Sequence, residues 1–115
     1  EVCAENALIQ ESYLNSFKTF KQDFATLGAP DAELATRVAK LKARFAQLDA
    51  DLVATLSALS EDDITSRTIE RGFPVPMNIQ FDIFVQAMLI FYGKASIYLL
   101  GLRKPLTQEW QQWIG

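Results

Sequence analysis

Hydrophobic positions in the first quarter of the chain recur with the period of an α-helix. The spacing predicts a helix from roughly Ala4 to Leu27, because its apolar residues are three and four positions apart and therefore share one face. These residues are Ile9, Tyr13, Phe17, Phe20, Phe24 and Leu27. Gly28 follows the last of them, where a glycine cap is expected, and Pro30 restarts the chain.

A second helix is predicted from roughly Asp31 to Leu59. Its apolar residues follow steps of four and three: Leu34, Val38, Leu41, Phe45, Leu48, Leu52, Leu56 and Leu59. Thr55 interrupts the strict heptad, which weakens the coiled-coil interpretation. The pattern favours a long antiparallel partner of the first helix in a bundle.

The segment after this helix loses the helical period. Ser60 to Asp63 form a turn with capping potential. The sequence "GFPVP" holds two prolines and a glycine within five residues, which indicates an extended crossover between Ile64 and Pro76.

A third helix is predicted from roughly Asn78, a good cap, to Leu100. It carries one broad apolar stripe and a second, narrower stripe of isoleucines, whereas a surface helix needs only one stripe. The broad stripe holds Phe81, Phe84, Val85, Met88, Phe91, Tyr92, Ala95, Leu99 and Leu102. The narrow stripe holds Ile79, Ile83, Ile90 and Ile97. Leaving four isoleucines in water would forgo roughly 6–12 kcal/mol, comparable to a whole domain's stability.

The four isoleucines are therefore interface candidates. We expect them to meet a helix of this chain, a segment missing from it, or a second subunit. Gly93, inside the same helix, costs about 1 kcal/mol relative to alanine, and its expected use is to let another backbone come close. After Pro105 a short helix capped by Thr107 is expected, with Trp110, Trp113 and Ile114 closing one end of the bundle.

Composition narrows the class of protein. A chain of 115 residues, half of them hydrophobic, predicts one domain over residues 1–115 with an all-α, up-down bundle of three long helices and a short C-terminal helix. The net charge of −3 argues against nucleic-acid binding, which needs clustered Lys and Arg. The first residues resemble the interior of a helix and not a signal peptide, so a fragment or an N-terminally truncated chain is expected. The single cysteine, Cys3, suits a reducing compartment, and we expect a cytoplasmic protein.

The residue types limit the chemistry. There is no histidine, which excludes Ser-His-Asp catalysis and a histidine-based zinc site. Glu61, Asp62 and Asp63 lack the alternating ligands of a calcium loop, so a polar turn is favoured. Residues 83–102 are long enough to cross a membrane, but Lys94 falls near their middle, and we expect no membrane span.

The stretch "AMLIFYGKASIYLLGLRKP" resembles the last long helix of the DinB-like superfamily, four-helix bundles that include metal-dependent thiol transferases and maleylpyruvate isomerase relatives. The family pattern is His-x-x-x-His-Arg-Gly-Gln, followed by Tyr-Leu-x-x-Leu-Gly and a proline. Gly93 matches the glycine, Lys94 takes the place of the glutamine, and Tyr98 and Leu99 match the tyrosine-leucine pair. "LSALSEDD" and the irregular crossover after it also resemble the family.

The departures from the family pattern imply a degenerate metal site. The two ligand positions of the last helix fall on Ala87 and Phe91, which bind no metal, and the third would lie at or before Glu1. The family's first helix is also missing from the chain. The resemblance therefore implies a module that binds instead of catalysing, with no cofactor. Its expected partner is a second copy, another helical protein segment, or a small apolar ligand in a pocket formed by Ala87, Phe91, Tyr92 and Tyr98.

Two alternatives stay open. One is a transferase that uses a non-histidine or metal-independent site. Its polar candidates are Asp82, Gln86, Tyr92, Lys94 and Tyr98. The other is a purely structural fragment of a longer bundle.

Overall fold

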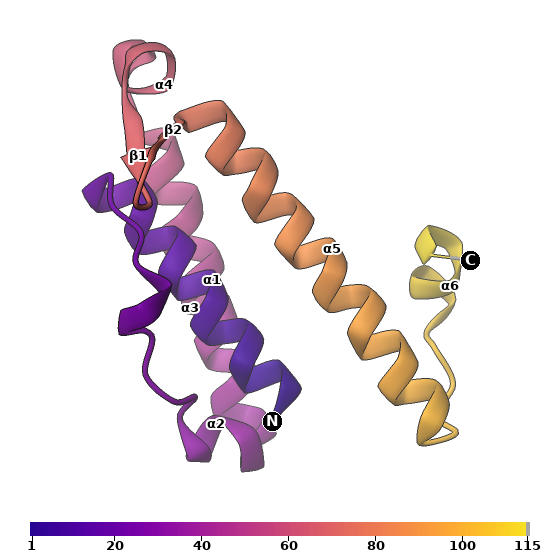
Figure 1. Cartoon of the computed structure of the whole chain (residues 1–115). Helices are drawn as coiled ribbons and strands as arrows, with labels where there is room; N and C mark the ends of the chain where they lie inside the picture. The colour runs from indigo at the N-terminus through magenta and orange to yellow at the C-terminus, as the bar shows by residue number, and fades with distance from the viewer. Residues whose placement is uncertain (115) are drawn as a thin grey trace. The chain divides into compact units, whose positions relative to one another are not determined.

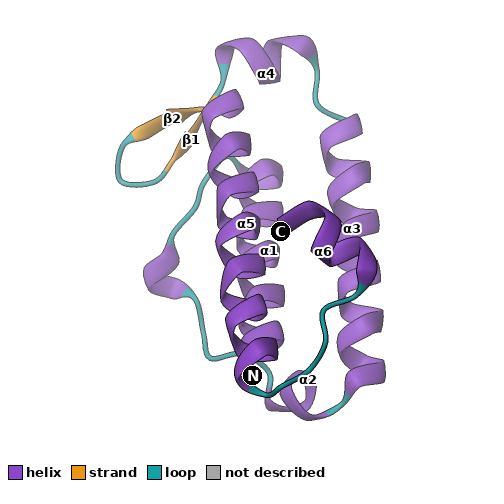
Figure 2. Cartoon of the chain, turned by 90° about the vertical axis from the view of Figure 1, so that its right-hand side faces the viewer, coloured by secondary structure: helices purple, strands orange, loops and turns teal. Residues whose placement is uncertain are grey.

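The computed structural model describes the backbone of residues 1–114 and the side chains of residues 1–112. The chain is mostly helical, in agreement with the predicted all-α class (Figures 1 and 2). The long helices are α1 (Val2–Thr19), α3 (Val38–Ser57) and α5 (Met77–Gly101). The short elements are the 3₁₀ turn η1 (Phe24–Thr26), α2 (Ala32–Thr36), α4 (Glu61–Ser66), β1 (Thr68–Glu70), β2 (Pro74–Pro76) and α6 (Gln108–Ile114). The predicted roles of Trp113 and Ile114 lie outside the described side chains.

The chain divides into two compact units, Glu1–Phe84 and Val85–Gly115, and the boundary falls inside α5. The first, the N-terminal unit, contains α1 to β2 and the first two turns of α5. The second, the C-terminal unit, contains the rest of α5 and α6. The prediction of one domain over residues 1–115 stays a prediction.

Helices α1 and α3 lie side by side in the N-terminal unit and run in the same direction (Figures 1 and 2). Gln10 near the middle of α1 donates a hydrogen bond of 2.7 Å to Asp49 of α3, while Phe17 near its end lines a groove with Leu56. Contacts that advance together along both helices require a parallel pair. The predicted antiparallel pairing of the first two long helices is therefore wrong, because the segment between them returns along the pair before α3 starts.

Two clusters of apolar side chains, most of them buried, hold this unit together. Ala7 and Leu14 of α1 pack against Leu48 of α3, and Phe45 and Leu52 lie against this cluster. An aromatic cluster joins α1 to the start of α5: the Phe17 ring lies 6.2 Å from Phe84 and 6.3 Å from Phe81, and Tyr13 lies 5.4 Å from Phe84. These rings remove large apolar areas from water at the helix contact.

The first helix ends earlier than its hydrophobic pattern predicts. It stops at Thr19, and Phe20 takes a left-handed conformation with φ of 58°. The Glu70 N–H donates to the Phe20 carbonyl, and the Gln22 N–H donates to the Glu70 carbonyl, both at 2.9 Å. The backbone of Phe20 and Gln22 thus forms hydrogen bonds with β1 and does not continue the helix. The predicted glycine cap at Gly28 is therefore wrong.

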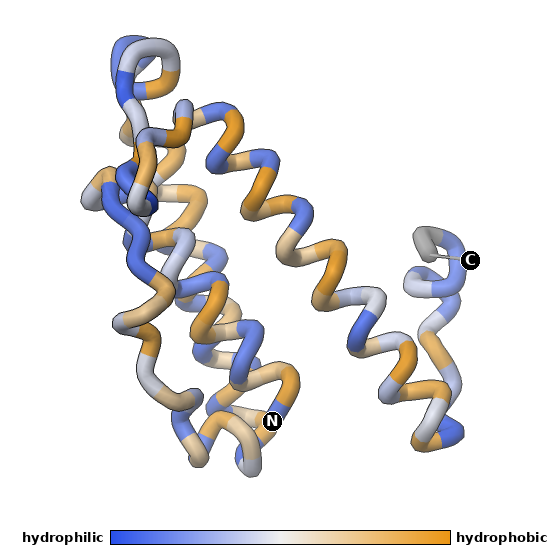
Figure 3. The backbone as a smooth tube through the Cα atoms, viewed as in Figure 1, coloured by the Kyte–Doolittle hydropathy of each residue, from blue (hydrophilic) through white to orange (hydrophobic). Residues whose placement is uncertain are grey.

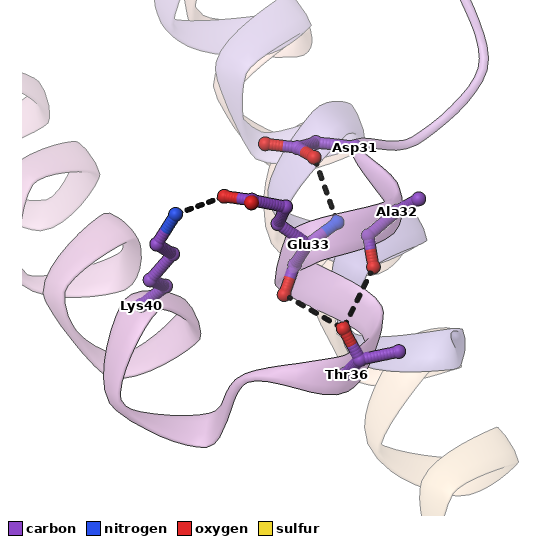
Figure 4. A network of polar contacts seen from close by, with 5 residues as sticks. All are labelled: Asp31, Ala32, Glu33, Thr36 and Lys40. Atoms are coloured by element: carbon purple, nitrogen blue, oxygen red, sulfur yellow. Dashed lines mark hydrogen bonds and ion pairs between the residues drawn. The ribbon is translucent and has the colours of Figure 1, made fainter.

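The second predicted helix is broken at Arg37, whose backbone is extended. Asp31 caps α2 by accepting a 2.8 Å hydrogen bond from the Glu33 N–H, and Glu33 forms an ion pair with Lys40 across the break (Figure 4). Figure 4 also shows the Thr36 hydroxyl donating to carbonyls of the preceding turn. The break takes Val38 out of the apolar stripe and leaves it 68% exposed.

The crossover contains a helix and a hairpin, where the pattern predicted only extended chain. Ser60 and Asp63 form a capping box that starts α4, as their spacing indicated. Strands β1 and β2 pair antiparallel, with Ile69 opposite Val75, and both of these side chains are buried. Gly72 supplies the positive φ of 87° that the turn between the strands requires.

The extent of the third long helix and the Thr107 cap agree with prediction, whereas the closing of one end of the bundle by Trp110 stays a prediction. Helix α5 spans Met77–Gly101 against a predicted 78–100. Helix α6 starts after Thr107, whose hydroxyl accepts a hydrogen bond from the Trp110 N–H at 3.2 Å. The Trp110 indole N–H donates to Ser96 at 2.9 Å, and its ring stands edge-on to Tyr92 at 5.5 Å.

Candidate functional site

Hydrophobic residues occur along the whole of α5, as the hydropathy colours of Figure 3 show. On its first two turns Met77, Gln80 and Phe84 are buried in the N-terminal unit. At 3.6 residues per turn, Ile79 and Ile97 lie about 140° around the helix from Phe84. The isoleucines therefore occupy a side of α5 that faces away from the aromatic cluster.

The predicted interface residues are largely uncovered within the described chain. Ile90 and Ile97 are 72% and 73% exposed, Ile79 is 43% exposed, and Ile83 is half-buried. We call this row the isoleucine face, and it also includes Gln86 and Gly93 at the intervening helical positions. The structure thus leaves open the contact that the four isoleucines were predicted to make.

The predicted pocket residues do not line either of the two grooves described below. Ala87 and Phe91 are half-buried, whereas Tyr92 and Tyr98 are exposed. The structure brings Phe91 and Tyr92 together, with ring centres 5.8 Å apart, and Tyr92 meets Trp110. Among the described ring contacts none joins Tyr98 to this group. The prediction of a ligand at Ala87 and Phe91 stays a prediction.

A buried polar network at the start of α5 was missed by sequence reasoning. The Gln80 amide nitrogen donates to Ser16 at 2.9 Å and to the Gln22 side-chain oxygen at 2.7 Å. Arg71 of the hairpin turn donates to the Gln80 side-chain oxygen at 3.1 Å. Gln80 and Ser16 are fully buried, and a buried amide is tolerated because its hydrogen bonds are made. A glutamine beside a buried stripe was the only signal in the sequence.

The chemistry of this network indicates a structural role. Gln80, Ser16 and Gln22 are neutral, and none of them titrates near neutral pH. Together they join α1, the chain after it, and the first turn of α5. The hydrogen bond from Arg71 to Gln80 links the hairpin turn to the same network. The network therefore fixes the entry of α5 into the N-terminal unit, and it offers no base or nucleophile activated by a neighbour.

An open groove of about 670 Å³ lies beside the network. Lys21 and Arg71 line it together with Asp23 and Glu70, and Phe24 and Phe73 add apolar surface. The Arg71 guanidinium lies 5.3 Å from the centre of the Phe24 ring and is already engaged with Gln80. Because charges of both signs line the groove, it has no clear preference for an anion or a cation.

A smaller, apolar groove of about 290 Å³ lies where the ends of α1 and α3 meet α4 and the first turns of α5. Its lining residues are Phe17, Leu56, Leu59, Ile64, Met77, Asn78 and Phe81. Its volume is close to the lower limit for small-molecule sites. It could accommodate one large apolar side chain or a compact apolar ligand.

Acidic side chains do not gather into a metal site among the described residues, where no group of three potential ligands could hold an ion. Of the carboxylates, Asp63 has a pKa below its ordinary value of 3.8, because the Ser60 hydroxyl and the Ser60 N–H donate hydrogen bonds to it. Asp63 lies in the cap of α4, so this shift reflects helix capping. The polar candidates Asp82 and Gln86 are exposed on α5.

Helix α5 is long and apolar enough to cross a membrane, judged by length and composition alone, and little of it is buried in the structure. One such helix is weak evidence for a span, since core helices of soluble proteins pass the same test. No family model, no curated protein and no solved structure matches the chain.

Proposed function

We propose that this chain is a cytoplasmic, non-catalytic module that binds a helical protein partner through the isoleucine face of α5. One observation carries the proposal: Ile90 and Ile97 are nearly three-quarters exposed on a helix that has two apolar sides. A helix of this kind is normally buried, either in a protein core or in a membrane. A partner that covers the isoleucine face supplies this burial.

The free energy available at this face is of the size that association needs. Ile79, Ile90 and Ile97 together expose the equivalent of about two whole side chains, so covering them contributes about 3–6 kcal/mol per chain. Two chains that cover each other gain about twice that amount, against roughly 4–15 kcal/mol for lost translational and rotational freedom. We therefore expect association to depend on protein concentration.

The DinB-like resemblance is part of the same proposal. It is supported by three long helices and by the irregular segment between α3 and α5, which contains α4 and the hairpin. At the family's ligand positions Ala87 and Phe91 have no donor atom for a metal. A bundle that has lost this site retains its surfaces, and we propose that binding is the remaining function.

Sedimentation velocity over a dilution series tests the proposal. We expect the wild-type chain to associate as its concentration rises, and the variant Ile90→Ser/Ile97→Ser to stay monomeric. The matched control is Val38→Ser/Val53→Ser, because these valines of α3 are 68% and 67% exposed but lie outside the isoleucine face. The control should associate like the wild type. A wild-type chain that is monomeric at its highest soluble concentration would overturn self-association.

The alternative function is a transferase with a non-histidine site. Its candidates are Asp82, Gln86, Tyr92, Lys94 and Tyr98, of which Tyr92 contacts Phe91 and Trp110. Metal analysis of the purified protein distinguishes the two proposals, because stoichiometric zinc, nickel or iron would favour the enzyme.

A further inference from the structure

We propose that the partner at the isoleucine face is a second copy of this chain, whose α5 lies antiparallel to the first across a two-fold axis level with residue 88. This inference rests on the proposed self-association and adds the orientation and register of the two helices. It is carried by the spacing of the isoleucine face, by the open space at Gly93, and by the positions of the charges on α5.

The spacing of the positions in the isoleucine face is the same in both directions along α5. Its residues are separated by steps of four, three, four, three and four, which is the alternation of a helix that packs along a heptad seam. The face consists of Ile79, Ile83, Gln86, Ile90, Gly93 and Ile97. Because these steps are palindromic, an antiparallel copy places a side-chain position opposite each position of the first helix.

The facing residues in this register complement each other in size. Ile79 lies opposite the partner's Ile97, and Ile83 lies opposite the partner's Gly93. A Cβ placed on Gly93 would meet no atom within 4 Å, so its open side is not used for packing in the described chain. A large side chain opposite the smallest one fills the layer without overpacking it. In a parallel pair Gly93 would face the partner's Gly93 and leave a void.

The third layer, with Gln86 opposite the partner's Ile90, is the weakest. The glutamine stem covers the isoleucine while its amide reaches the edge of the contact, as long polar side chains do. In a parallel pair Gln86 would instead face the partner's Gln86 in the middle of the seam. The antiparallel register thus keeps the two amides apart.

The charges on α5 also allow this register. Asp82 and Lys94 are the charged residues of the helix, and each lies six residues from the axis level. At a rise of about 1.5 Å per residue, the two copies of Asp82 lie about 18 Å apart along the helix axes, as do the two copies of Lys94. Like charges therefore do not meet, which avoids a destabilising pair.

The area available corresponds to a weak dimer. Leu89, which is 59% exposed, lies beside the isoleucine face and extends it. At roughly 100 Å² of apolar surface per full side chain, the exposed parts of Leu89 and the isoleucines give about 500 Å² in two chains. Since about 60% of an interface is apolar, the total reaches about 800 Å², the size of a weak, transient contact.

Disulfide trapping tests the register. In a Cys3→Ser background, which removes the exposed native thiol, Ile79→Cys and Ile97→Cys are made as two separate proteins. We expect a crosslinked dimer when the two are mixed and oxidised, and none from either protein alone. Leu89→Cys should crosslink with itself, because Leu89 lies one residue from the axis level.

The outcomes separate this inference from the proposed function. Self-crosslinking of Ile97→Cys would show a parallel pair, and dimers without crosslinks in the mixture would show another contact; either result overturns the register and leaves self-association intact. Monomers at every concentration would overturn the register and self-association, and would leave a different helical protein as the partner of the proposed function. Flotation of the wild-type chain with phosphatidylcholine vesicles, without crosslinking, would assign the face to a membrane and overturn both proposals.

A second variant tests the space at Gly93. Gly93→Leu should weaken dimerisation at least about tenfold, because leucine would collide with the partner's Ile83. Gly101→Leu is the matched control: a Cβ there also meets no atom within 4 Å, but the register places nothing of the partner's α5 opposite it. Equal dimerisation of wild type and Gly93→Leu would overturn the proposed layer, while circular dichroism verifies that both variants fold.

Discussion

The two units of this chain differ in what they bury. All the buried hydrophobic side chains among the described residues lie between Ala4 and Phe84, in the N-terminal unit. In the described part of the C-terminal unit, large apolar side chains such as Ile90, Ile97 and Leu102 are mostly exposed. The same helix begins in one unit and ends in the other. The N-terminal unit thus has its own core, whereas large apolar side chains of the described C-terminal unit remain exposed.

Their polar contacts differ in the same way. In the N-terminal unit Gln80 joins segments far apart in the sequence and is fully buried. In the C-terminal unit the indole of Trp110 donates to Ser96 only fourteen positions away, at a partly exposed site. The difference teaches that α5 is fixed at its first turns by tertiary contacts, whereas further along its large apolar side chains are exposed.

The largest expected effect is on the core. Phe17→Ala should lower the free energy of unfolding by about 3–5 kcal/mol, because it removes a fully buried ring that contacts Phe81 and Phe84. The measurement is urea unfolding followed by circular dichroism at low protein concentration. Ile90→Ala should change the free energy by no more than about 0.5 kcal/mol under the same conditions. Equal losses from both variants would remove the distinction between the units.

The next largest effect on the free energy of unfolding is expected in the buried network around Gln80. Gln80→Leu should lower this free energy by about 1–3 kcal/mol, because Gln22 loses its donor and Arg71 loses its acceptor. Gln86→Leu is the matched control in the same helix, where the side chain is exposed, and at protein concentrations too low for dimerisation it should be nearly neutral. If Gln80→Leu proved as stable as the wild type, the network would not fix the start of α5.

A smaller effect is expected at the cap of α4. Ser60→Ala should cost about 1 kcal/mol, the usual effect of losing an N-cap hydroxyl. The pKa of Asp63 should also rise toward 3.8, since the Ser60 hydroxyl that lowers it is removed. NMR titration of the Asp63 carboxyl measures this directly, with Ser57→Ala as a control.

The same shift gives the cap a pH dependence. Because the folded-state pKa of Asp63 lies below its unfolded value, the stabilisation is fully present above about pH 4 and is lost as the pH falls through the folded-state pKa. Stability of α4 that rises on acidification below pH 4 would contradict this sign.

The smallest effect is expected in the C-terminal unit. Trp110→Phe keeps an aromatic ring beside Tyr92 but removes the hydrogen bond to Ser96, at a cost of about 0.5 kcal/mol for a partly exposed site. Ser96→Ala should give the same loss, and the double variant should add little to either change. Hydrogen exchange of the α6 amides is the measurement. Fully additive losses would indicate that the two side chains act separately.

The elements that were predicted correctly are those that depend on residues close together in the sequence. The capping box of Ser60 and Asp63, the Thr107 cap and the extent of α5 all follow from residues within a few positions of one another. The predicted end of the first helix at Leu27 was wrong because the backbone of Glu70, about fifty residues away, forms hydrogen bonds with the backbone of Phe20 and Gln22. The break at Arg37 was missed because both flanking segments keep the helical period.

The candidate site divides in the same way. The four isoleucines were identified by their period, although their exposure was not predicted. The Gln80 network was not identified, because its members come from distant segments. The pocket at Ala87 and Phe91 rested on a resemblance, which supplies no packing information.

By itself the sequence determined that the chain is mostly helical, where α5 lies, and that α5 has two apolar sides, because helical period and caps act over a few residues. Only the tertiary structure decided that α1 and α3 run parallel, where α1 ends, and which side of α5 is left uncovered. These outcomes depend on competition between distant segments for the same backbone groups and apolar surface, and such competition leaves no periodic pattern in the chain.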